Sequence, residues 1–283
     1  SYSQVLNDYE IKTYFARDIL ASILQPTSLS FDAVLSILIQ KANDIKNEYG
    51  TYPIQNYKEV IEQLLLLDMK RYGKNRALTL NWKLSLYPLL PLGNLIYARD
   101  QMNVLLSKRV RSYMKKVIRR PEVELYELVY KKIFNEKNSS VMLPYNETFE
   151  GGDAYIHDGT IYVGIGTRTS IGAAKHIFQE LEEQINDLEY KFALVIDEES
   201  EKRNHRDQML FMHLDTFSNP VGKNQIAVCL SEAKRRQVKM LERRNGKITI
   251  VNKHKSFLDY LFEDGQELVS IPDSEQQSFG CNF

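Results

Sequence analysis

Short apolar segments of strand length alternate with amphipathic segments of helix length through the second half of this chain. Ser170 is placed to cap one of these helices, in which Ala173, Ile177, Leu181 and Ile185 recur every three or four residues. Residues 231–244 predict a second, basic helix. The strand-length segments are residues 154–156, 161–163, 192–196, 210–214, 225–229 and 248–251. This alternation, without long linkers, is typical of a mixed α/β fold.

Local signals mark where several elements begin and turn. Asp158-Gly159 between two strand segments predicts a type I′ hairpin turn, because both residues tolerate positive φ. Pro121 stands where a helix can begin. Residues 95–98 predict a short strand that leads into Arg99 and Asp100. Residues 16–80 carry helical stripes and capping patterns, so they predict a helical insertion within one domain that covers residues 1–283.

Charge and cysteine content exclude several classes of protein. The 283 residues hold 37 Lys and Arg against 37 Asp and Glu, which removes the usual electrostatic case for a nucleic-acid or membrane-surface protein. A nucleic-acid binder is kept only as a minor alternative, prompted by basic runs at 108–120 and 234–244. No apolar run reaches the roughly 18 residues that span a bilayer. Two cysteines and no signal-peptide pattern favour a cytoplasmic protein, and the five histidines lack zinc-ligand spacing, so no metal is expected.

Three segments bring carboxylates together with a histidine. Residues 94–100 end in Arg99-Asp100, and Glu150-Gly151-Gly152-Asp153 places two glycines between two carboxylates. His213 and Asp215 lie two apart at the end of an expected strand, so their side chains would share one face. Carboxylates that converge on one pocket favour a bound cation, and a planar guanidinium matches them in bidentate geometry.

Together these segments resemble the arginine deiminase family of guanidine-modifying enzymes. The resemblance rests on the Asn-to-Arg-Asp segment at 94–100, Glu-Gly-Gly-Asp at 150–153, Gly-x-x-x-Arg-Thr within 164–169 and Met-His-Leu-Asp-Thr at 212–216. Their order and approximate spacing are also those of the family. The helical segment at 16–80 is similar to the insertion that separates arginine deiminases from the smaller dimethylarginine hydrolases.

The resemblance implies a fold, a reaction and a set of site residues. The fold would be a pseudo-fivefold α/β propeller of the pentein type, and the reaction would be cofactor-free hydrolysis of L-arginine to L-citrulline and ammonia through a covalent cysteine-amidino intermediate. Asp100 and Asp215 would hold the guanidinium, His213 would transfer protons, and Glu150 would orient His213. The substrate's α-carboxylate would be bound by Asn94, Arg119 and Arg168, with Arg120 as the alternative to Arg119.

The nucleophile is where the resemblance departs from the family pattern. Cys229 lies in an apolar segment and reads as a core residue. Cys281, within Gly280-Cys281-Asn282, aligns with an ordinary turn position of the family, so the nucleophile is expected beyond Phe283. Family segments are likewise expected ahead of residue 1. Cys281 acting in a shortened arrangement remains the alternative.

Two other functions stay open beside arginine hydrolysis. The same fold could hydrolyse agmatine or a methylated arginine, or transfer the amidino group. A non-catalytic relative would bind arginine or a partner protein without turnover. Homo-oligomerisation also stays open.

Overall fold

The computed structural model describes residues 12–14, 19, 97–116, 119–134, 140–252, 256–278 and 280–281. The chain divides into two compact units, one formed by Ser1–Ile96 with Lys116–Lys137 and the other by Tyr97–Lys115 with Asn138–Phe283. In the first unit, helix α8 covers Arg120–Phe134, as Pro121 predicts. Apart from Ile19, the predicted insertion at 16–80 lies outside the described residues.

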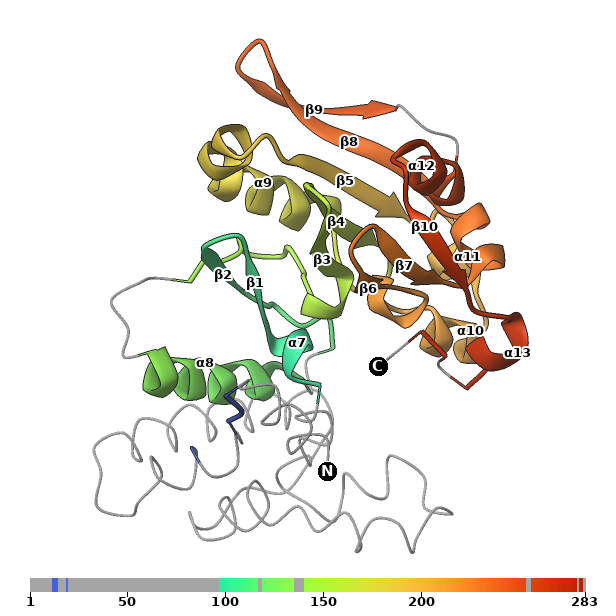
Figure 1. Cartoon of the computed structure of the whole chain (residues 1–283). Coiled ribbons are helices and arrows are strands. Elements are labelled where there is room, and N and C mark those ends of the chain that lie inside the picture. Colours follow the sequence, from blue (N-terminus) through green and yellow to red (C-terminus); the bar gives the residue numbers. More distant parts are fainter. Residues whose placement is uncertain are drawn as a thin grey trace, which may run out of the picture. The chain divides into compact units, whose positions relative to one another are not determined.

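The second unit is built on a five-stranded mixed sheet (Figure 1). Its strands are β3 (Ala154–His157), β4 (Thr160–Ile165), β5 (Lys191–Ile196), β8 (Gln237–Arg244) and β9 (Lys247–Asn252), in the order β3-β4-β5-β8-β9. β4 and β5 are parallel, and the other neighbours are antiparallel. Asp158 and Gly159 join β3 to β4 with φ values of 47° and 72°, which confirms the predicted turn.

Helix α9 (Ile171–Asp187) is the crossover between the parallel strands β4 and β5. The Ser170 side chain accepts a hydrogen bond from the Ala173 backbone N–H, so the predicted cap is confirmed. In β5, Phe192, Leu194 and Ile196 join the apolar cluster that includes α9. Both faces of the sheet are buried at β5, because Ala193 and Val195 point instead into a second cluster on the other side.

A three-stranded sheet contributes to that second cluster. It contains β6 (Ser218–Gly222), β7 (Gln225–Val228) and β10 (Glu267–Ser270), in the order β10-β7-β6. The remaining elements of this unit are α7 (Ala98–Gln101), β1 (Met102–Leu105), β2 (Lys108–Arg111), α10 (His205–Leu210), α11 (Leu230–Arg235), α12 (Phe257–Glu263), α13 (Asp273–Gln276) and the 3-10 turns Gly151–Asp153, Ser200–Lys202 and Leu214–Thr216.

Two sequence predictions about the neighbourhood of His213 and β8 are wrong. Residues 210–214 do not form a strand, because the Asn204 side chain caps α10 and a 3-10 turn follows at Leu214–Thr216. Residues 231–244 do not form one helix: α11 ends at Arg235, and β8 then pairs with β5 and β9. In β8, Val238 and Met240 alternate with half-buried polar residues, a strand pattern that the basic residues obscure.

Residues 97–101 also differ from the expected strand. Residues 95 and 96 lie outside the described part, but Ala98–Gln101 is a short helix and the strand follows at Met102. Asp100 is therefore buried within a helical turn rather than at a strand end. The mixed α/β class is confirmed, while closure into a propeller stays a prediction.

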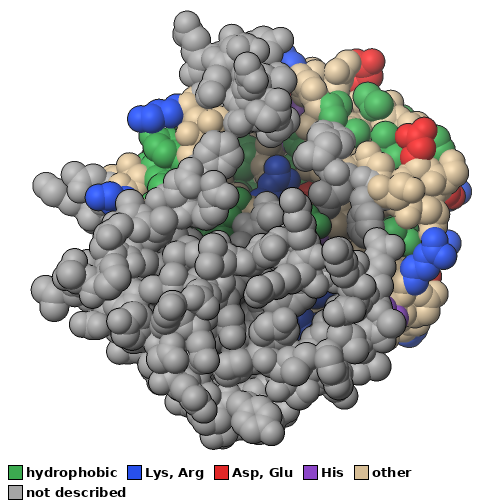
Figure 2. Space-filling model, turned by 90° about the horizontal axis from the view of Figure 1, so that it is seen from below, with side chains coloured by type: hydrophobic (Ala, Val, Ile, Leu, Met, Phe, Trp, Pro, Cys, Tyr) green, Lys and Arg blue, Asp and Glu red, His purple; other side chains and the backbone are tan. Residues whose placement is uncertain are grey.

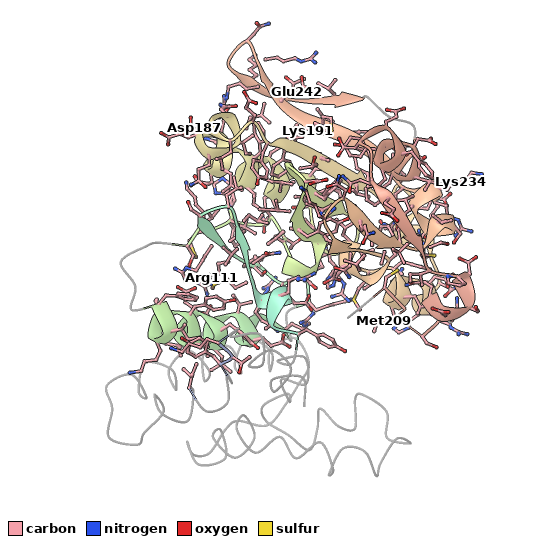
Figure 3. The ribbon with its side chains drawn as sticks, viewed as in Figure 1. Arg111, Asp187, Lys191, Met209, Lys234 and Glu242 are labelled. Carbon is pink, nitrogen blue, oxygen red and sulfur yellow. The ribbon has the colours of Figure 1, made fainter. Side chains whose placement is uncertain are left out.

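The surface of the described residues carries charges of both signs. Figure 2 shows basic and acidic side chains on the coloured part of one face. Figure 3 places the exposed Asp187 and Lys234 at the periphery of the second unit. In the part of the chain that the structure describes, no helix combines the length and apolar character needed to cross a bilayer.

Candidate functional site

Three backbone segments meet at the Glu150–Asp153 loop. Gly151 packs so closely on the Arg99 carbonyl that a Cβ there would lie 1.9 Å from the carbonyl oxygen, so only glycine allows this approach. The Asn103 side-chain amide donates to the carbonyl oxygens of Gly151 and Ala154, both at 2.7 Å. These contacts bring Asp100, in α7, against the loop that carries Glu150.

Asp153 fixes the segment that carries His213 to the same loop. Its Oδ1 accepts from the Leu214 backbone N–H at 3.0 Å, and its Oδ2 accepts from the Thr169 hydroxyl at 2.6 Å. The Thr216 hydroxyl donates to the His213 carbonyl at 2.6 Å and tightens the 3-10 turn. His213 and Asp215 are therefore brought to the loop by a turn, not by a shared strand face.

Asp100, His213 and Asp215 converge beside Gly152. A Cβ on Gly152 would lie 2.8 Å from Asp100 Oδ1, 2.8 Å from His213 Nδ1 and 3.1 Å from Asp215 Oδ1. The missing side chain at Gly152 thus leaves the carboxylates and the imidazole facing one point. Two carboxylates around one point suit a planar cation with several N–H donors.

The imidazole of His213 contacts a carboxylate through each ring nitrogen. His213 Nε2 is 2.9 Å from Glu150 Oε2, and His213 Nδ1 is 3.6 Å from Asp100 Oδ1. Burial lowers the pKa of His213, but the hydrogen bond to Glu150 and the charges of Asp153, Asp100 and Glu150 outweigh it and raise the pKa to about 9. The imidazolium is therefore the favoured form at neutral pH.

Glu150 is completely buried, and three groups among the described residues contact its carboxylate. The Lys115 backbone N–H donates to Oε1 at 3.1 Å, Arg168 Nη1 lies 3.3 Å from the same oxygen, and His213 binds Oε2. A buried carboxylate needs such partners to offset its lost hydration. Arg168 therefore balances the charge of Glu150, a contact that the sequence resemblance did not imply.

Two further carboxyls of the site, those of Asp215 and Asp153, have raised pKa values. Burial raises the pKa of Asp215 to about 6, with a further rise from Asp100 that His213 and Arg99 partly oppose. Burial likewise raises the pKa of Asp153 to about 7, although His213 and the hydrogen bond from Thr169 lower it. Asp215 also has a cationic neighbour, because Arg99 Nη1 lies 3.4 Å from its Oδ2. The same nitrogen donates a hydrogen bond to Asn219 Oδ1 at 3.3 Å.

The structure brings together five of the site residues predicted from sequence. They are Asp100, Glu150, Arg168, His213 and Asp215. Arg119 belongs to the other unit, where its guanidinium binds Glu122 at 3.0 Å and both side chains are buried. Asn94 lies outside the described residues.

Sequence reasoning assigned no role to Asp153, Thr169 or Arg99, and it interpreted Gly152 only as part of a tight turn or a close backbone approach. All four lie inside the motifs that were recognised. The signal that could have found Asp153 is its place as the second carboxylate of Glu-Gly-Gly-Asp. The signal for Gly152 is weaker, because two adjacent glycines equally suit an ordinary turn.

Cys281 has the environment of a core residue. Its side chain is fully buried in the cluster that contains Cys229 and Phe257, and burial raises the pKa of its thiol to about 12. Its carbonyl oxygen accepts from the Asn219 side-chain amide at 2.6 Å, and that amide also donates to the Asp215 carbonyl. Nucleophilic cysteines instead have a lowered pKa and partial exposure. Among the described residues, no group of three His, Cys, Asp or Glu side chains could hold a metal ion.

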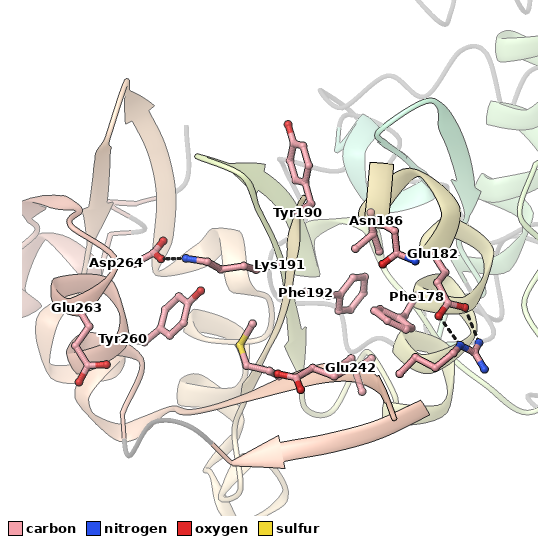
Figure 4. Close-up of a pocket in the computed structure, with 14 residues that line it drawn as sticks. Phe178, Glu182, Asn186, Tyr190, Lys191, Phe192, Glu242, Tyr260, Glu263 and Asp264 are labelled. Carbon is pink, nitrogen blue, oxygen red and sulfur yellow. Dashed lines mark hydrogen bonds and ion pairs between the residues drawn. The ribbon is translucent and has the colours of Figure 1, made fainter. Parts of the chain in front are cut away.

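A separate cavity of about 730 Å³ lies where β5 and β8 diverge, between α9 and α12 (Figure 4). Its lining includes Phe178, Phe192 and Tyr260, with a Lys191–Asp264 ion pair on one side and an Arg243–Glu182 ion pair on the other. None of the carboxylates that surround Gly152 lines this cavity.

Comparison with known proteins gives three informative matches. YkgA of Bacillus subtilis (strain 168), an uncharacterized protein, is 25% identical over 187 residues, which are 66% of this chain and 51% of YkgA. The chain therefore spans about half the length of this curated relative. Among solved structures, DDAH from Pseudomonas aeruginosa, complexed with citrulline, is 14% identical with a TM-score of 0.40, over 66% of this chain and 73% of that chain. ArgZ, an arginine dihydrolase from cyanobacteria, is 16% identical with a TM-score of 0.46, over 68% and 25%.

A family model gives the widest match. The model described as arginine deiminase covers residues 2–283, which includes every motif that forms the site around Gly152. The chain belongs to the arginine deiminase family.

Proposed function

We propose that this chain carries the guanidinium-binding and proton-transfer part of an arginine deiminase-type hydrolase, which converts L-arginine to L-citrulline and ammonia. The observation that supports this most is the convergence of Asp100, His213 and Asp215 on the point beside Gly152. Asp100 and Asp215 would hold the guanidinium nitrogens, because each carboxylate can accept two N–H donors of the planar cation.

His213 and Glu150 would transfer the protons. Since the pKa of His213 is raised to about 9, its imidazolium can donate a proton to the departing ammonia. The neutral imidazole that remains can then take a proton from the water that releases citrulline. Glu150, bound to His213 Nε2 at 2.9 Å, would keep the ring in place and stabilise its charge.

The covalent step needs a thiolate that attacks the guanidinium carbon, forming a C–S bond before the C–N bond to ammonia breaks. The burial and the raised pKa of Cys281 argue against its serving as this nucleophile. We therefore propose that the thiolate comes from outside residues 1–283. A cytoplasmic setting, expected from the two cysteines, belongs to the same proposal.

Recognition of the α-carboxylate is the third part of the proposal. Arg168 lies at the site but contacts Glu150, while Arg119 and Asn94 are proposed only from their motif positions. Comparing the affinities for arginine, agmatine and a methylated arginine tests this part. A preference of about tenfold or more for arginine over agmatine, about 1.4 kcal/mol, would support a carboxylate-binding group.

Gly152→Ala and Gly166→Ala form the matched pair that tests the site. A methyl group at 152 would collide with Asp100 and His213, whereas at 166 its nearest neighbour would be Ser200 Cβ at 3.6 Å, an ordinary contact. We expect calorimetry to detect arginine binding by the unmodified chain and by Gly166→Ala, and no binding by Gly152→Ala. Equal binding by the two variants, or no binding by the unmodified chain, would overturn the proposed site.

Turnover is tested separately by citrulline formation from L-arginine. We expect binding without citrulline, in both the unmodified chain and Cys281→Ala. Citrulline that disappears in Cys281→Ala would support the hydrolase reaction and overturn the assignment of the nucleophile to another part of the protein.

A further inference from the structure

Four charged side chains form a buried network beside the segment that carries His213 and Asp215. Asp197 follows β5, Glu232 lies in α11, and Arg203 and Arg236 bridge them. Arg203 Nε and Arg236 Nη1 are each 2.9 Å from Asp197 Oδ2, and Arg236 Nε donates to Glu232 Oε1 at 2.7 Å. The Arg203 guanidinium also binds both carboxylate oxygens of Glu232, at 3.2 and 2.5 Å. The two positive and two negative charges balance.

Arg236 contacts both ends of the segment that carries His213 and Asp215. Its Nη2 donates to the Phe211 carbonyl at 3.1 Å, and its guanidinium carbon lies 4.7 Å from the centre of the Phe217 ring. Arg203 adds a weaker contact, with its guanidinium carbon 5.2 Å from the Phe211 ring centre. One rigid, planar group therefore holds residues 211 and 217, which bracket the 3-10 turn of the site.

Stability alone does not account for such an arrangement. Buried ion pairs replaced by packed apolar residues are often neutral or stabilising, because the lost hydration of the charges offsets their attraction. The guanidinium of Arg236 also fixes the directions of its hydrogen bonds, because its N–H donors lie in one rigid plane. An ammonium group keeps the charge but cannot satisfy Asp197, Glu232 and the Phe211 carbonyl in that plane.

We propose that Arg236 is a positioning residue, which holds the Phe211–Phe217 segment so that His213 stays hydrogen-bonded to Glu150 and Asp215 stays beside Asp100. This inference rests on the proposed function of the site for its consequence in arginine binding. Its geometric part, the placement of His213, is independent of any substrate.

Arg236→Lys and Arg243→Lys form the test pair. Arg243 also forms a bidentate ion pair, with Glu182, but this pair lies at the cavity between β5 and β8. The readout is the pKa of His213, followed by NMR of its ring protons in the full chain. We expect Arg236→Lys to move this pKa from about 9 toward its ordinary value of 6.5 by about one unit or more, because the contact with Glu150 loosens. Arg243→Lys should leave it unchanged.

Arginine affinity is the second readout of the same pair. We expect Arg236→Lys to weaken binding by about tenfold or more, and Arg243→Lys to leave it unaltered. A lower melting temperature in Arg236→Lys with the His213 titration unmoved would mean a structural role only, and would overturn the inference. If Arg236→Lys fails to fold, the charge-neutral pair Arg236→Gln with Glu232→Gln replaces it, and an unmoved His213 titration there would likewise overturn the inference.

The two proposals fail separately. If the unmodified chain does not bind arginine, the proposed function is wrong, but the His213 titration still decides whether Arg236 positions the ring. If arginine binds and the titration does not respond to Arg236, only the positioning role is lost.

Discussion

At the scale of single residues, the site is a cluster of buried groups whose charges depend on one another. His213 lies between Glu150 and Asp100, and the charge of Asp100 contributes to the raised pKa of Asp215. A bound cation relieves this repulsion. A cation bound there would therefore favour the ionised form of Asp215.

The raised pKa of Asp215 predicts a pH dependence for the proposed binding of arginine. The value in the free protein is raised to about 6, and a bound guanidinium favours the ionised carboxylate. Arginine affinity should therefore fall as the pH drops below about 6, because protons compete with the ligand. Calorimetric titration between about pH 5 and 8 checks this. Tighter binding on acidification would contradict it, and Asp215→Asn should bind weakly at every pH.

At the scale of elements, caps and turns decide how the site segments are presented. Ser170 begins α9 directly after the Gly-x-x-x-Arg-Thr motif, and its hydroxyl also binds Glu147 and the Thr148 carbonyl. The cap therefore connects the start of α9 to the segment that precedes Glu150.

Ser170→Ala should destabilise the protein by about 1 kcal/mol or somewhat more, since it removes the cap of α9 together with the contacts to residues 147 and 148. Urea unfolding measures the loss as a lower midpoint with an unchanged slope. Ser274→Ala, at an exposed position in α13, is the matched control and should change stability by less than about 0.5 kcal/mol. Equal losses in the two variants would contradict the capping role.

At the scale of the whole molecule, the site affects how stability depends on pH. The pKa of His213 is raised from 6.5 to about 9, so the folded state holds this proton more tightly than the unfolded state. The resulting stabilisation is complete below about pH 6.5 and is lost as the pH rises through about 9.

Thermal unfolding between about pH 6.5 and 9.5 tests this linkage. The unmodified chain should lose melting temperature more steeply over this range than His213→Gln, which has no imidazole to titrate. Parallel curves for the two proteins would mean that the pKa of His213 in the folded state is close to its ordinary value.

The sequence alone predicted those features of the structure that depend on residues close together in the chain. The cap at Ser170, the turn at Asp158-Gly159 and the buried stripe of α9 each depend on contacts within a few positions, so their patterns are local. The motifs also indicated four residues that meet in the candidate site, namely Asp100, Glu150, His213 and Asp215. Expected strands near Asp100 and His213 were wrong because short apolar runs do not distinguish a strand from a helical turn.

The site itself required the folded chain. Asp100, Gly152 and Asp215 are separated by about fifty residues or more along the sequence. Tertiary contacts bring them to one point, among them the packing of Gly151 on the Arg99 carbonyl and the hydrogen bond from Leu214 to Asp153. The strand β8 forms because β5 and β9 supply its hydrogen bonds, although the basic sequence of residues 231–244 predicted a helix. The raised pKa values of His213 and Asp215 likewise depend on burial and on distant charges, which no local pattern contains.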